Sequence, residues 1–155
     1  MPQTIAKFQN FVEEYARGDG LVVIHLQYII EALEVADPSK IVDILMNTKD
    51  GCWGGTLLHY AAVHGHTKLI KAVPDNLTKV QRFNLLSTEN DNLTNVLQEA
   101  AGNSRVKASR YLLDSVDHIM SVHLIKHKTS FNYTTIHSFS ANGIYNATVL
   151  EILFN

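Results

Sequence analysis

Cysteine is almost absent from this sequence, since Cys52 is the only one among 155 residues. A lone cysteine cannot form a disulfide within the chain, so a buried core must hold the fold, and a reducing, cytoplasmic compartment is expected. Charged residues are also few, at 18%, and the formal net charge is −2. This balance offers no broad cationic surface for phosphates or anionic lipids, and it argues against nucleic acid or a membrane as the partner.

Long hydrophobic runs are missing as well. The longest apolar run in the first half, residues 21–24, stops at His25, far short of the roughly 20 residues that a membrane span needs. The first ten residues hold one lysine and no unbroken apolar stretch, so a secretory signal is not expected. Hydrophobic residues nevertheless make up 46% of the chain, which is enough for a folded, soluble protein.

A fixed period runs through the sequence. The segment 56–66, TLLHYAAVHGH, is matched by residues 95–101 and, at the same spacing again, by residues 134–143. Apolar pairs farther along each segment return as well. These are Leu69-Ile70 with Val73, then Ala108 with Leu112-Leu113, then Val149-Leu150 with Leu153-Phe154. Internal periodicity of this kind is typical of helical repeat proteins.

The segment 56–66 resembles the signature of the ankyrin repeat, in which a Thr-Pro-Leu-His turn opens a short helix that carries paired alanines and closes at Gly-His. The resemblance implies an all-α, ankyrin-type helical repeat solenoid. An ankyrin unit is about 33 residues long and the period here is about 39, so each unit has a surplus of about six residues. Apolar spacing in residues 76–86 predicts that the surplus is an additional helix, with equivalents in 38–46 and 116–125.

We therefore expect one domain over residues 1–155. It comprises a capping helix (1–20), a partial unit (21–47) and three units (48–86, 87–126 and 127–155). At the start of the first additional helix, Asp37 is a good N-cap and Pro38 suits the first helical position.

The motif residues have structural roles in this interpretation. Thr56, His59 and His137 are expected to form hydrogen bonds within the turns, because a buried polar group without a partner costs about 1–3 kcal/mol. The alanine pairs keep the first helix of each unit slim. Gly65 and Gly143 are expected to end that helix in a left-handed conformation.

The resemblance also implies protein recognition by a concave face made of turn tips and inner helices. Its expected contact residues are Trp53, Tyr60, His64, Asn92, Glu99, Asn103, Phe131 and Tyr133. Large aromatic residues dominate many interface energies, although the three aromatic residues at the tips could instead pack on the next turn. The acidic residues nearby, Asp50, Glu89, Asp91 and Glu99, either favour a basic partner or form a solvated face.

Catalytic chemistry finds little support. His123 and His127 have a spacing that could bind a metal on a helix, but Lys126 and Lys128 would repel a cation. Nothing in the spacing gives Cys52 a base for nucleophilic catalysis, and the glycines around it lack the Lys-Ser or Lys-Thr of a phosphate loop. We expect no enzyme activity, metal, cofactor or small-molecule substrate.

The sequence thus predicts a protein–protein interaction module, such as an adaptor, scaffold or inhibitor. An alternative is a targeting repeat domain of a larger enzyme or of a secreted bacterial effector, whose catalytic part lies outside this chain. The expected location is the cytoplasm, or the host cytosol if the protein is such an effector.

Overall fold

The computed structural model describes residues 10, 31, 37–49, 53–73 and 77–137, and these residues form helices and no strands. The expected capping helix, most of the partial unit 21–47 and residues 138–155 of the last unit lie outside the described residues. The helices are α3 (Pro38–Asn47), α4 (Leu57–His64), α5 (Thr67–Ala72), α6 (Lys79–Ser87), α7 (Val96–Gly102), α8 (Val106–Asp114) and α9 (His118–Lys126).

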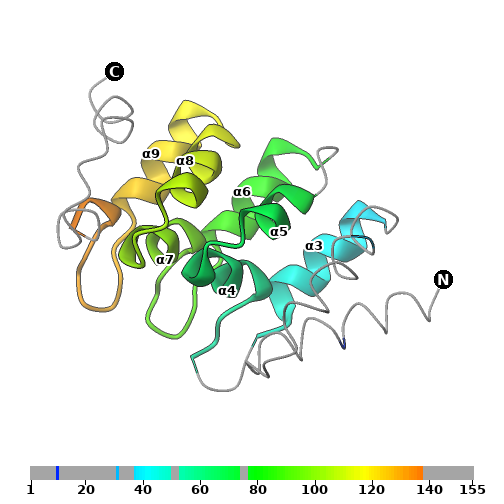
Figure 1. Cartoon of the computed structure of the whole chain (residues 1–155), viewed down its shortest axis with the longest axis horizontal. Helices are drawn as coiled ribbons and strands as arrows, with labels where there is room; N and C mark the ends of the chain where they lie inside the picture. Colours follow the sequence, from blue (N-terminus) through cyan, green and yellow to red (C-terminus); the bar gives the residue numbers. More distant parts are fainter. Residues whose placement is uncertain (1–9, 11–30, 32–36, 50–52, 74–76, 138–155) are drawn as a thin grey trace.

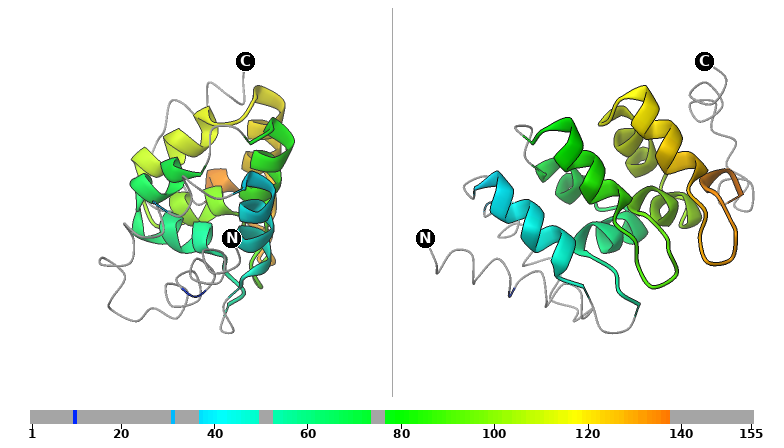
Figure 2. Two further views of the ribbon diagram at one scale, coloured as in Figure 1. Left: turned by 90° about the vertical axis from the view of Figure 1, so that its right-hand side faces the viewer. Right: turned by 180° about the vertical axis from the view of Figure 1, so that it is seen from behind.

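Helices from successive sequence units lie side by side in three rows. Helix α4 packs against α7, α5 against α8, and α6 against both α3 and α9. The row of α3, α6 and α9 is seen in Figure 2, and the loop before α7 and the loop after α9 project from the same end of the array (Figure 1). The fold is therefore helical and repeat-like.

The turn that opens each unit is built by the same hydrogen bonds. The backbone N–H of Thr56 donates to Nδ1 of His59 at 3.1 Å, and the N–H of Thr134 donates to Nδ1 of His137 at 3.1 Å. In the middle unit the N–H of Asn95 donates to Oε1 of Gln98 at 2.9 Å. The predicted structural role of these histidines is confirmed, and a glutamine can fill it too.

Left-handed backbone also follows the period. Within the described ranges, positive φ angles occur at the evenly spaced positions 54, 93 and 132, and at positions 65 and 104, which are separated by the same interval. Gly65 has φ 68° and caps α4, as predicted, and Ser104 takes the same conformation after α7 with φ 60°.

The additional helix is confirmed, because α6 and α9 lie in the two stretches that predicted it and α3 lies in the third. Each begins at a side-chain N-cap, with Asp37 accepting from the N–H of Ser39, Thr78 from Gln81 and Asp117 from Met120. Such caps typically stabilise a helix by about 1 kcal/mol.

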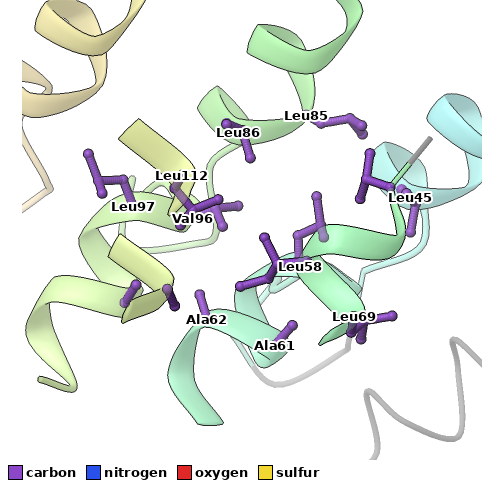
Figure 3. Packing of buried hydrophobic residues seen from close by; sticks show 14 of the residues in the cluster. Leu45, Leu58, Ala61, Ala62, Leu69, Leu85, Leu86, Val96, Leu97 and Leu112 are labelled. Carbon is purple, nitrogen blue, oxygen red and sulfur yellow. The ribbon is translucent and has the colours of Figure 1, made fainter. Parts of the chain in front are cut away.

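The core lies between the rows. The paired alanines of α4 and α7 are fully buried, and the predicted apolar positions of α5 and α8 are buried as well. Figure 3 shows Leu58 and Leu112 in this cluster, with Leu85 and Leu86 reaching it from α6. Small alanines let α4 and α7 approach closely, while the leucines fill the space between the rows.

Candidate partner-binding face

Adjacent loop tips are joined by a repeated backbone hydrogen bond. The N–H of Asp91 donates to the carbonyl of Trp53 at 2.8 Å, and the N–H of Ser130 donates to the carbonyl of Asn92 at 2.9 Å. The second bond is the first one moved by one repeat unit. The three loops therefore form one edge of the array.

The eight expected contact residues fall on this edge and on the two helices beside it. Trp53, Asn92 and Phe131 are equivalent tip positions, Tyr60 and Glu99 are equivalent on α4 and α7, and so are His64 and Asn103 at the ends of these helices. Tyr133 is at the tip of the third loop. We call the surface formed by these eight residues the tip face.

The indole ring of Trp53 is less accessible to a partner than its position at a loop tip suggests. Its indole Nε1–H donates to the Tyr60 hydroxyl at 2.7 Å, the two ring centroids are 5.1 Å apart, and both side chains are half-buried. A Cβ added at Gly55 would lie 2.7 Å from the indole, so this glycine makes room for the ring. The alternative in which this aromatic residue packs holds in part, because the ring packs on α4 of its own unit rather than on the next turn.

Phe131 and Tyr133 are exposed on the third loop. Their side chains are 68% and 57% accessible, and Tyr133 contacts the imidazole of His137 with ring centroids 5.7 Å apart. Of the three aromatic residues at the tips, these two have the free area that a partner could bury.

Leu93 was missed by the sequence interpretation. It lies beside Asn92 at the second tip, is 45% exposed, and has φ 55°. This conformation costs a bulky L-residue about 1–2 kcal/mol. The carbonyl of Leu93 accepts from Nε2 of His127 at 2.8 Å. The period itself could have revealed the strain, because Gly54 is the equivalent residue one unit earlier.

Relief of this strain gives a first prediction. Leu93→Asn is expected to raise the free energy of unfolding by about 1 kcal/mol, since asparagine tolerates the left-handed region better and Asn132 already occupies the equivalent position. Urea unfolding measures the change, with the exposed Val80→Asn as a control for the loss of an apolar side chain. A destabilised Leu93→Asn variant would mean that the leucine packs against something essential.

The side chain of Asn90 connects Glu99 to the second loop through hydrogen bonds. Asn90 is 4% exposed and its Oδ1 accepts from the N–H groups of Asn92 at 3.0 Å and Thr94 at 3.1 Å. Its Nδ2 donates to Oε1 of Glu99 at 2.9 Å. Burial raises the pKa of Glu99, and the hydrogen bond from Asn90 opposes that rise.

The raised pKa predicts that Glu99→Gln stabilises the fold at neutral pH. A carboxyl group whose pKa is higher in the folded state binds protons more readily when folded, so the ionised form opposes folding at pH values above that pKa. The amide oxygen of glutamine keeps the acceptor for Asn90. We expect a higher Tm at pH 7, and we expect the advantage to shrink as pH falls through the raised pKa of Glu99. An equal advantage at all pH values would contradict the electrostatic cause.

The rings of the two histidines with metal-like spacing have different neighbours. His123 lies on α9 with its ring near Phe83, whereas His127 follows the end of the helix and its Nε2 lies 3.2 Å from Oε1 of Glu89. Within the described residues, no group of three potential ligands is placed to hold a metal ion. The helices of this part of the chain also include none long and apolar enough to cross a membrane.

No protein-family model and no curated protein sequence matches the chain. Among solved structures, a chain in the crystal structure of the yeast ribosomal protein Rps3 with its chaperone Yar1 is similar, with a TM-score of 0.63 and 18% identity. The match covers 87% of this chain and 84% of that chain. Similarity at this level of identity concerns the fold, and it supports the helical, repeat-like arrangement over most of the chain.

Proposed function

We propose that this protein is an ankyrin-type repeat module that binds another protein through the tip face. The proposal rests on the signature-like turns at Thr56, Asn95 and Thr134, which share one hydrogen-bond pattern, and on the stacked rows of helices. A repeat array of this kind presents an extended surface made of one loop and one helix from each unit.

The main evidence for this binding surface is the presence of exposed apolar side chains at adjacent loop tips. Leu93 lies on the second loop and Phe131 and Tyr133 on the third, and the two loops are linked by the bond from Ser130 to Asn92. Complete burial of one such side chain stabilises a complex by about 1.5–3 kcal/mol. Aromatic anchors in a buried centre are a common source of binding energy.

The role proposed is that of an adaptor, scaffold or inhibitor in the cytoplasm, without catalytic activity. The similar solved structure is a complex between a ribosomal protein and its chaperone, which supports protein binding as a function available to this fold. The histidines of the turns take part in hydrogen bonds that build those turns.

Site-specific crosslinking tests the proposed surface. A photoreactive phenylalanine analogue at position 133 should capture a protein from extracts of the cells that express this chain. The same analogue at position 119, which is 70% exposed in the row of α3, α6 and α9, should not capture that protein. Capture of the same protein from both positions, or from position 119 alone, would contradict a tip-face site.

A further inference from the structure

We infer that the tip face recognises a cationic side chain, arginine or lysine, of its protein partner, and that Glu99 accepts it. This inference rests on the proposed function and names the chemistry of its partner. It starts from a charge that has no counter-ion within the described part of the chain.

Glu99 is half-buried on α7 and its hydrogen-bond donor is the neutral amide of Asn90. Among the described residues, no lysine, arginine or histidine nitrogen lies within ion-pair distance of its carboxylate. Removing a carboxylate from water costs free energy unless it is paired. A partner cation at this position would recover part of that cost, and Glu99 is therefore poised for an opposite charge.

The other acidic residues near the loops are differently placed. Oε1 of Glu89 lies 3.2 Å from Nε2 of His127, which is an ion pair when the imidazole is protonated, and the Glu89 side chain is 40% exposed. Asp91 is exposed at the second tip, where solvent screens its charge. The cation nearest along the chain, Arg105 at the start of α8, donates through Nε to the carbonyl of Val63 at 2.9 Å. Of the acidic residues near the second loop, Glu99 is the half-buried one without a counter-ion in the described ranges.

Aromatic residues belong to the same tip face as Glu99. Tyr60 holds the equivalent position on the packed helix α4 and forms a ring pair with Trp53. Phe131 and Tyr133 lie exposed on the following loop. Carboxylates and aromatic rings together attract guanidinium and ammonium groups, through charge-assisted hydrogen bonds and cation–π contacts. The expected ligand is a basic residue within an otherwise apolar segment of the partner.

Peptide titration monitored by NMR tests the charge requirement directly. The probes are an acetylated, amidated peptide with one arginine flanked by leucine and serine, a lysine version, and a version with citrulline, the neutral isostere of arginine. We expect the arginine or lysine peptide to shift the backbone signal of Glu99 and the side-chain amide of Asn90. The citrulline peptide should bind at least about fivefold more weakly. Equal affinity for citrulline would overturn the inference.

Two variants with the same change of net charge locate the site. Glu99→Gln should weaken binding of the cationic peptide on the order of tenfold, whereas Asp91→Asn should change it less than about twofold. An equal loss in both variants would indicate general attraction and overturn the inference. The Tm of Glu99→Gln, which is expected to rise, is measured beside binding so that unfolding can be distinguished from loss of the contact.

Binding of the crosslinked partner separates this inference from the proposed function. If Phe131→Ala with Tyr133→Ala abolishes binding while Glu99→Gln binds like wild type, the partner binds the tip face. The inferred cation site at Glu99 is then wrong. If none of these substitutions affects binding, the proposed function itself fails.

Discussion

Replacing His59 by leucine is expected to lower the free energy of unfolding by about 3 kcal/mol or more, whereas glutamine should cost less than about 1 kcal/mol. His59 is completely buried. Its Nδ1 accepts from the N–H of Thr56 at 3.1 Å, and its Nε2 lies 2.9 Å from the carbonyl of Thr94, which can only accept. These contacts assign the proton to Nε2. Leucine would leave one buried and one part-buried backbone group unsatisfied, and each buried group costs about 1–3 kcal/mol.

The chain itself provides the control for this experiment. In the middle unit Gln98 accepts from the N–H of Asn95 through Oε1 and donates to the carbonyl of His127 through Nε2 at 2.6 Å. A glutamine at position 59 can therefore accept from Thr56 as Gln98 accepts from Asn95, and its Nε2 remains a donor, although Gln98 donates to a carbonyl that is not the equivalent of Thr94. Urea unfolding at pH 7 measures all three proteins. If glutamine is as damaging as leucine, ring shape rather than hydrogen bonding holds the turn.

Ala101→Leu is the second substitution with a large expected effect. Ala101 is fully buried on α7, which packs directly against α4, and Ala62 is its equivalent there. The larger leucine side chain cannot fit between the helices without displacing them. Overpacking of this kind typically costs about 1–3 kcal/mol, and thermal unfolding should show a clear fall in Tm.

Substitution of the neighbouring residue is a matched control, because it is expected to raise stability rather than lower it. Gly102 is exposed, and a Cβ placed on it would have no heavy atom within 4 Å. Gly102→Ala should stabilise the protein by up to about 1 kcal/mol, because alanine restricts the unfolded chain. A stable Ala101→Leu variant, or an unstable Gly102→Ala variant, would contradict the assignment of the packed face of α7.

Much of this architecture was predictable because its determinants are local. Asp37 and Pro38 mark the start of α3, and the turn from Thr56 to His59 depends on residues that are close in sequence. The period then transfers each local assignment from one unit to the next. Apolar spacing also identified α6, since the helix must cover the core with Leu85 and Leu86.

Contacts between loops and helices were not predictable in the same way. The bond from Trp53 to Tyr60 and the bond from Asn90 to Glu99 depend on how each loop folds over its helix. Sequence position alone therefore left open whether Trp53 packs or contacts a partner. It also left open whether Glu99 is a solvated residue or a half-buried one.

Leu93 and Glu99 share a property that links the fold to the proposed function. One is a bulky residue in left-handed backbone and the other a half-buried carboxylate without a counter-ion in the described chain. Both features oppose stability, and both occur at the tip face or directly beside it. Local departures from stable design tend to collect where a protein acts.

The most direct test of the account is the dissociation constant of the crosslinked partner, measured by calorimetry for two double variants. Phe131→Ala with Tyr133→Ala should weaken binding on the order of a hundredfold with little change in Tm. Val80→Ser with Ile119→Ser removes side chains that are 60% and 70% exposed in the row of α3, α6 and α9, and it should leave the constant within about twofold. The reverse pattern, or equal losses in both variants, would contradict binding through the tip face.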